Sequence, residues 1–220
     1  MRDRVYLDWN ATTPLRPEAR AAMAAAFDVS GNPSSVHSEG RAARKLIEDA
    51  RGTVAVAVGA DPRSVVFTSG GTEANALALT PGLRRGGRGP AQRLIVSAIE
   101  HPSVLAGGRF AQDAIEIAPV LPSGVIDLER LAAALASGPP ALVSVMLANN
   151  ETGAIQPVPE VAALVHEAGG ILNVDAVQAF LKIPININAL GADVLTVSAH
   201  KIGGPKGVGA AVAADGLEGL

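Results

Sequence analysis

The sequence predicts an α/β fold in which a mostly parallel central sheet is covered by helices on both faces. Short β-rich runs alternate along the chain with Ala-rich helical stretches, which is typical of repeated strand and helix units. The β-rich runs are apolar throughout instead of alternating between apolar and polar residues, as expected for strands that are buried on both faces. We therefore expect one sheet at the centre of the molecule.

The elements follow in order along the chain. Apolar residues at helical spacing predict a helix over residues 38–58, and Gly59 with Asp61 and Pro62 supplies its end. Strands are expected at residues 65–68, 94–98, 115–120, 142–147, 171–174, 194–197 and 208–212. Helices are expected between them, at residues 73–80, 104–112, 128–136 and 159–168.

Composition excludes several classes of protein. The chain has 220 residues, of which 48% are apolar and 18% charged, so it can bury a large core as one large domain with or without a small appendage. A formal net charge of −3 argues against a nucleic-acid partner. No apolar run approaches the roughly 18 residues of a membrane span, so we expect no membrane partner and a cytoplasmic location. With no cysteine and four scattered histidines, neither a disulfide nor a metal site is expected.

Polar residues follow the expected strands, at the edge where ligands bind in open α/β sheets. The first group, Ser69-Gly70-Gly71-Thr72-Glu73, combines a strand end, a glycine turn and a helix start, which suits a phosphate. Further polar groups after later strands are Glu100-His101, Asn149-Asn150-Glu151, Asp175 to Gln178, and Ser198 with His200 and Lys201. An amine at Lys201 and a carboxylate at Asp175 are the two groups that bind pyridoxal phosphate, through its aldehyde carbon and its ring nitrogen.

Each of these residues also has a purely structural interpretation. Thr72 or Asp175 could cap the helix that follows, and His101 could be a surface residue before a helix that starts with proline. Asn149 and Asn150 could be turn residues, and Lys201 a solvated strand end. The combination of all these groups, and no single one of them, favours a cofactor site.

Some other features receive only a structural interpretation. We expect His37 to lie in a loop, His166 on a helix surface, and the basic stretch 84–89 in a solvated loop. The glycines of residues 203–209 lead into a strand, so they do not form a dinucleotide-binding turn.

A family resemblance covers essentially the whole chain. Its motifs include Asn149-Asn150-Glu151-Thr152-Gly153 and Ser198-Ala199-His200-Lys201, with further matching segments at residues 6–8, 11–14, 31–35, 67–75, 100–101, 174–178 and 204–207. Together they resemble the cysteine desulfurases of the NifS and IscS type, which are class V members of the fold-type I aminotransferase superfamily. The resemblance implies the large-domain fold of pyridoxal-phosphate-dependent transferases, similar to that of aspartate aminotransferase and incomplete at the carboxyl terminus.

The resemblance also implies roles for individual residues. Lys201 and His101 would be catalytic, with Lys201 bonded to the cofactor and active in proton transfer at the substrate α-carbon, and His101 stacked on the ring. Asp175 would pair with the ring nitrogen and Gln178 with the phenolic oxygen. The phosphate would be held by Gly71, Thr72, Ser198 and His200. Asn150 would contact the substrate carboxylate and the cofactor.

The implied reaction converts L-cysteine to L-alanine and transfers the sulfur to an enzyme persulfide, for iron-sulfur cluster assembly or other sulfur delivery. In the family, the nucleophilic cysteine lies in a second stretch of comparable length, and this chain has no cysteine. We therefore expect the chain to be inactive alone, with a separate carboxyl-terminal chain and a sulfur-accepting scaffold protein as possible partners. The alternatives are another class V aminotransferase or lyase, or a noncatalytic remnant that binds cofactor or a partner.

The domain organisation follows from the same resemblance. Residues 1–15 would form an arm that normally joins the small domain, and residues 16–220 the large cofactor-binding domain. Without the small domain the arm is expected to lie loose. Fold-type I enzymes are dimers, so we expect a homodimer and exposed apolar surface where other segments pack.

Overall fold

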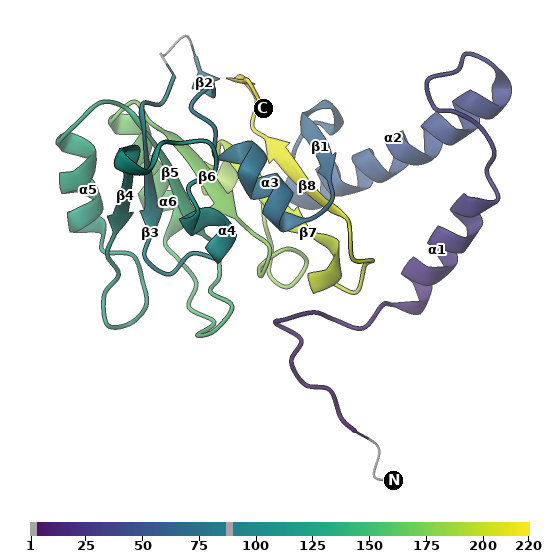
Figure 1. The fold of residues 1–220 in the computed structure, drawn as a ribbon, viewed down its shortest axis with the longest axis horizontal. Coiled ribbons are helices and arrows are strands. Elements are labelled where there is room, and N and C mark those ends of the chain that lie inside the picture. The colour runs from purple at the N-terminus through teal and green to yellow at the C-terminus, as the bar shows by residue number, and fades with distance from the viewer. Residues whose placement is uncertain (1–3, 87–89) are drawn as a thin grey trace.

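A seven-stranded mixed sheet forms the centre of the molecule (Figure 1). The computed structural model describes residues 4–86 and 90–220. The strands in spatial order are β1 (Val65–Thr68), β8 (Gly209–Ala213), β7 (Val194–Ser198), β6 (Ile171–Asp175), β5 (Ala141–Met146), β3 (Arg93–Ser97) and β4 (Ile115–Ala118). Neighbouring strands from β7 to β4 pair in parallel, whereas β8 is antiparallel to both β7 and β1. The predicted sheet is confirmed, and only β8 opposes the common direction.

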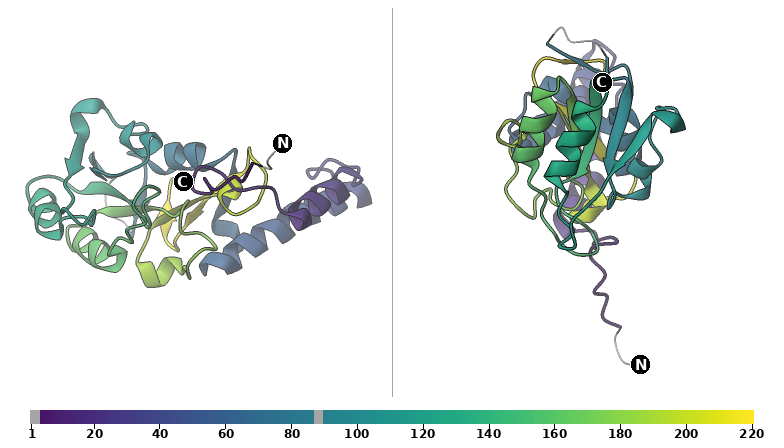
Figure 2. Two further views of the ribbon diagram at one scale, coloured as in Figure 1. Left: turned by 90° about the horizontal axis from the view of Figure 1, so that it is seen from below. Right: turned by 90° about the vertical axis from the view of Figure 1, so that its left-hand side faces the viewer.

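Helices cover both faces of this sheet. One face packs against α2 (Ser38–Val58), α5 (Leu128–Ala136), α6 (Val158–Glu167) and α7 (Ile187–Leu190), and the other against α3 (Gly71–Ala78) and α4 (Pro102–Leu105). Successive side chains of β3 pack on opposite faces of the sheet. Ile95 packs in the core that includes α2, α5, α6 and α7, whereas Leu94 and Val96 pack in the core that includes α3 and α4. The left view of Figure 2 shows helices flanking the sheet on both sides.

Helix α1 (Pro17–Phe27) and the amino-terminal half of α2 extend away from the sheet (Figure 1). Helix α1 has no buried residue, so the described residues leave its apolar side chains partly or fully exposed. Within residues 4–86 and 90–220, no helix is both long enough and apolar enough to cross a membrane.

The prediction of a helix at residues 104–112 is wrong except at residues 104–105. Helix α4 ends at Leu105, and Gly107 and Gly108 follow with φ values of 79° and 57°. These left-handed conformations are accessible to glycine and end the helix, although the apolar residues around them have helical spacing. Helices α1 and α7 were not predicted, nor were the short paired strands β2 (Arg84–Arg85) and β9 (Leu217–Glu218).

Two structural interpretations of single residues also need correction. The expected solvated loop at residues 84–89 begins with strand β2, and its residues 87–89 lie outside the described residues. His166 is not simply a helix-surface residue, because its Nε2 lies 2.9 Å from the buried carboxylate of Asp193. Arg85 forms an ion pair with the same carboxylate, so β2 is held to the amino-terminal edge of the sheet by charge.

Candidate active site

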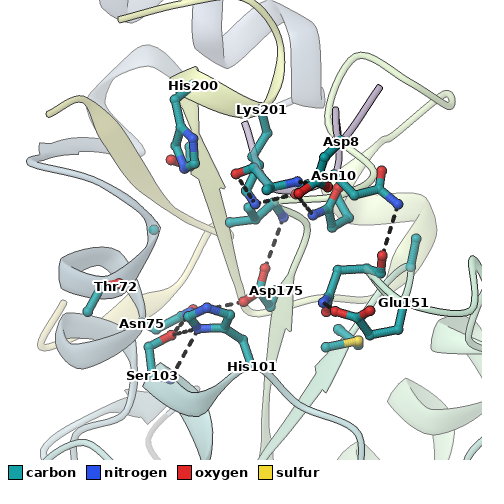
Figure 3. Close-up of a pocket in the computed structure, with 18 residues that line it drawn as sticks. Asp8, Asn10, Thr72, Asn75, His101, Ser103, Glu151, Asp175, His200 and Lys201 are labelled. Atoms are coloured by element: carbon teal, nitrogen blue, oxygen red, sulfur yellow. Dashed lines mark hydrogen bonds between the residues drawn. The ribbon is translucent and has the colours of Figure 1, made fainter. Parts of the chain in front are cut away.

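A cavity of about 580 Å³ lies at the carboxyl ends of the parallel strands (Figure 3). Because these ends share one edge of the sheet, residues far apart in the sequence meet there. The cavity is lined by all nine residues expected at a cofactor site, namely Gly71, Thr72, His101, Asn150, Asp175, Gln178, Ser198, His200 and Lys201. The structure therefore brings these nine residues together around one space.

Lys201 ends a short 3-10 helix, Ala199–Lys201, that directly follows β7. Its Nζ donates to the carbonyl oxygens of Asn10, at 2.5 Å, and Ala11, at 2.9 Å. Burial lowers the pKa of the Lys201 amine, and the positive charge of Lys182 lowers it further. A lowered pKa makes the neutral, nucleophilic amine available at lower pH than in a solvated lysine.

Asp175 is the last residue of β6 and is buried. Its Oδ2 accepts a hydrogen bond from Asn75 Nδ2 and its Oδ1 accepts one from the Val177 N–H, both at 2.9 Å. Burial raises the pKa of this carboxyl, and the two hydrogen bonds oppose that effect by stabilising the charged form. The bond from Val177 closes a turn, and residues 176–186 contain no helix, so the alternative in which Asp175 caps a following helix is not observed.

His101 lies at the amino-terminal end of α4, directly before Pro102. Its Nδ1 is 2.8 Å from the Ser103 hydroxyl and also accepts the Ser103 backbone N–H at 3.1 Å. The imidazole therefore has the expected position before a helix that starts with proline, and it also lines the cavity (Figure 3).

The turn at the start of α3 forms another part of the cavity wall. Gly70 is the residue before the helix, and no side chain caps it, so the alternative in which Thr72 caps α3 is not observed. Glu73 instead accepts the Ser69 N–H. A second cavity of about 360 Å³ adjoins this turn and is lined in part by Thr72, His200 and Lys206. Burial, and then the charges of Lys201 and Lys206, lowers the pKa of His200.

The amino-terminal arm covers part of the cavity. Asn10 donates from Nδ2 to the Asn150 carbonyl oxygen at 2.9 Å, and Gln178 Nε2 donates to the Asn10 carbonyl oxygen at 2.8 Å. The Thr13 N–H donates to the His200 carbonyl oxygen at 2.9 Å. The expectation of a loose arm is wrong for this part, because the arm is tied by hydrogen bonds to three segments of the site.

Several residues of the site were missed by sequence reasoning. Asp8, Asn10, Asn75 and Ser103 also line the cavity. Asn75 had a signal, because it lies four residues after Gly71 and so on the same face of α3. No pattern in the sequence indicated the arm residues, because their approach to Lys201 depends on contacts across about 190 positions of the sequence.

The residues present fit pyridoxal phosphate by their chemistry. A carboxylate suits a cationic ring nitrogen, a primary amine suits an aldehyde, and the hydroxyl, imidazole and backbone N–H groups of the α3 turn and of residues 198–200 suit a phosphate. In the described part of the chain, His, Asp and Glu side chains are nowhere grouped in threes or more around a possible metal position.

The fold and this set of residues define the large-domain fold of the fold-type I pyridoxal-phosphate-dependent enzymes. The profile of the family described as aminotransferase class-V matches residues 5–219. The chain belongs to this family.

Comparison with individual proteins supports this family assignment. The chain is 42% identical over 211 residues to the cysteine desulfurase IscS of Rickettsia rickettsii, covering 94% of this chain and 51% of the relative. It is 46% identical over 215 residues to a cysteine desulfurase of Cereibacter sphaeroides, covering 94% and 54%. The X-ray structure of a NifS-like protein from Rickettsia africae superposes with a TM-score of 0.86 at 37% identity, covering 96% of this chain and 58% of that one. The chain thus spans about half the length of the relatives it matches.

Proposed function

We propose that the chain is the pyridoxal-phosphate-binding portion of a cysteine desulfurase, which converts L-cysteine to L-alanine and delivers the sulfur to an acceptor. The observation that carries this proposal is the convergence of the Lys201 amine and the Asp175 carboxylate on one cavity. The relatives described as cysteine desulfurases supply the substrate class.

When bound, pyridoxal phosphate supplies a ring that withdraws electrons from the α-carbon of an attached amino acid. In this proposal Asp175 stabilises positive charge at the ring nitrogen, and Lys201 holds the aldehyde carbon. His101 would pack on the ring, and Gln178 would donate to the phenolic oxygen. The amine of Lys201 would also hold or give up the proton at the substrate α-carbon.

The remaining residues orient the two ligands. Gly71, Thr72, Ser198 and His200 bind the phosphate, with the start of α3 contributing backbone N–H groups. Asn150 orients the substrate carboxylate, and the arm residues that bond to Asn150 and Gln178 exclude water from this side of the cavity.

Sulfur removal requires a thiolate that attacks the substrate sulfur, and the 220 residues contain no cysteine. The proposal therefore places the nucleophilic thiol in another polypeptide or in sequence beyond these residues. Residues 16–220 are assigned to the large domain, and the arm of residues 1–15 to the small domain. The proposal includes a homodimer in the cytoplasm that serves a sulfur-accepting scaffold protein in iron-sulfur cluster assembly.

The cofactor assignment is tested by titrating the purified chain with pyridoxal phosphate and recording its visible absorption. We expect a new absorption band that saturates with added cofactor and is absent in Lys201→Ala. Lys45→Ala is the control, because this lysine is exposed on α2, pairs with Asp49 and does not line the cavity. An unchanged spectrum in Lys201→Ala would refute the assignment.

The substrate assignment is tested separately, by adding L-cysteine together with the cysteine-bearing stretch of a full-length relative as a second polypeptide. Release of sulfide supports a desulfurase. Formation of a keto acid without sulfide would indicate another class V enzyme.

A further inference from the structure

A chain of hydrogen bonds in the wall of the cavity links Asp175 to His101. Asn75 is the central residue, and its side chain is buried with 1% exposure. Its Nδ2 donates to Asp175 Oδ2 at 2.9 Å and to the Ser103 hydroxyl at 3.1 Å. The Ser103 hydroxyl in turn lies 2.8 Å from His101 Nδ1 (Figure 3).

The chemistry of the groups fixes the direction of the first bonds. An ionised Asp175 can only accept, so the amide nitrogen of Asn75 must face it. The Asn75 oxygen then points the other way, where it accepts from the Thr196 hydroxyl at 2.7 Å. Both N–H donors and the oxygen of the buried amide therefore have partners, which leaves Asn75 one orientation.

This orientation determines the proton on His101. Because the Ser103 oxygen accepts from Asn75, its hydroxyl hydrogen is free to point to His101 Nδ1. The backbone N–H of Ser103 donates to the same Nδ1 at 3.1 Å. Two donors facing Nδ1 make it an acceptor, so the neutral imidazole carries its hydrogen on Nε2.

We propose that Asn75 and Ser103 are positioning residues that couple the carboxylate of Asp175 to the orientation and tautomer of His101. The proposal deepens the function proposed above and rests on it, because in that function Asp175 and His101 both contact the cofactor ring. It assigns His101 a specific role towards that ring and its substrate. The neutral imidazole can donate a hydrogen bond from Nε2, while Nδ1 accepts from Ser103.

The chain provides a matched control for this relay. Asn173 Nδ2 donates to the Ser144 hydroxyl at 2.9 Å, and both side chains are fully buried in the same sheet. Neither residue lines the cavity. Ser144→Ala therefore removes a serine hydroxyl that bonds to an asparagine, as Ser103→Ala does, but it leaves the relay intact.

The first experiment needs no cofactor. Long-range nitrogen–proton NMR of the labelled chain should show His101 with its hydrogen on Nε2. Ser103→Ala should move the Nδ1 resonance and raise the population of the Nδ1–H tautomer, because one of the two donors is lost. Ser144→Ala should leave both unchanged. A wild-type chain with the hydrogen on Nδ1, or a Ser103→Ala spectrum identical to wild type at His101, would overturn the proposal.

The second experiment measures cofactor affinity by absorbance titration. Losing one such hydrogen bond should weaken binding of pyridoxal phosphate about three- to tenfold in Ser103→Ala. Asn75→Leu should weaken it more, because Asp175 loses its amide donor, while Ser144→Ala should match wild type. Equal affinity in wild type and Ser103→Ala would contradict the coupling. If the wild-type chain took up no cofactor, the proposed function would fail, and the NMR experiment would still decide the relay.

Discussion

Glu100 is a second buried carboxyl close to Asp175, and its chemistry differs from that of a solvated glutamate. Its Oε1 accepts the Met146 backbone N–H at 2.7 Å, whereas its Oε2 has no partner among the described residues. Burial raises the pKa of Glu100 well above its ordinary value, and the negative charge of Asp175 raises it further. Glu100 therefore holds a proton more readily than Asp175 and leaves the negative charge on the residue that faces the cavity.

This predicts a pH dependence of stability with a defined sign. A carboxyl whose pKa is raised on folding stabilises the protein below its unfolded pKa of about 4.3, and this contribution is lost as pH rises through the folded value. The free energy of unfolding should therefore fall with rising pH less steeply in Glu100→Gln, which stays neutral, than in wild type. Urea unfolding at several values between pH 5 and pH 8 measures this.

The exposed Glu129→Gln serves as the control and should keep the wild-type slope. Asp175 contributes with the same sign, so the slope of Glu100→Gln should be reduced and not abolished. Equal slopes in Glu100→Gln and wild type would show that Glu100 has no raised pKa in the folded chain.

Residues of the site were predictable from the sequence where they directly follow an apolar run. Lys201 and Asp175 are examples, because the end of a buried strand marks the edge where ligands bind. Asn75 and Ser103 were not predicted, since their importance comes from hydrogen bonds across 100 and 28 positions that local patterns do not encode. The same holds for the arm carbonyls that accept from Lys201.

At the scale of elements, the strands were predicted to within about two residues, because buried runs of β-branched and aliphatic residues have few alternatives in this fold. Helices α2 and α5 were predicted at their observed bounds. The expected helix at residues 104–112 was not observed, because the left-handed glycines outweigh apolar periodicity. Strands β2 and β9 are only two residues long, too short for periodicity to be read.

The antiparallel strand β8 packs closely against the turn before α3. A Cβ added at Gly209 would lie 2.6 Å from the carbonyl carbon and 2.7 Å from the Cα of Gly70. These are backbone atoms, which cannot move aside as a flexible side chain does. Glycine at this position therefore lets β8 approach the turn before α3.

Gly209→Ala is expected to displace the Gly70 turn, destabilise the chain by about 1–3 kcal/mol and weaken cofactor binding. Gly52→Ala is the matched control, because Gly52 lies inside α2 and an added Cβ would meet nothing within 4 Å. That substitution should stabilise the chain by about 0.5–1 kcal/mol. Thermal unfolding and cofactor titration of both variants measure the contrast. A Gly209→Ala variant as stable as wild type would show that β8 does not pack this closely against the backbone of Gly70.

At the scale of the whole molecule, large apolar side chains remain uncovered around α1 and α2. Phe27, Val36 and Val56 are more than four-fifths exposed, at 85%, 88% and 82%. An open apolar depression of about 870 Å³ lies nearby and is lined in part by Leu46 and Phe67. Exposed apolar surface of this kind is typical of a site where another protein segment packs, which supports the proposed homodimer.

If this surface forms the homodimer, Phe27→Asp combined with Val56→Asp should shift the chain towards monomer, because each aspartate would have to be desolvated in the interface. Sedimentation velocity over a range of concentrations measures the shift. Ile117→Asp is the control, because Ile117 is 51% exposed on β4, at the opposite edge of the sheet (Figure 1). The double variant associating as strongly as wild type would place the interface elsewhere.

The central claim is that the amine of Lys201 and the carboxylate of Asp175 serve one cofactor. The most direct measurement is to incubate the chain with pyridoxal phosphate, reduce it with borohydride, and locate the added mass by peptide mapping. We predict one reduced cofactor per chain, on the peptide that contains Lys201, with lower occupancy in Asp175→Asn. Label spread over surface lysines, or no retained label at Lys201, would contradict the account.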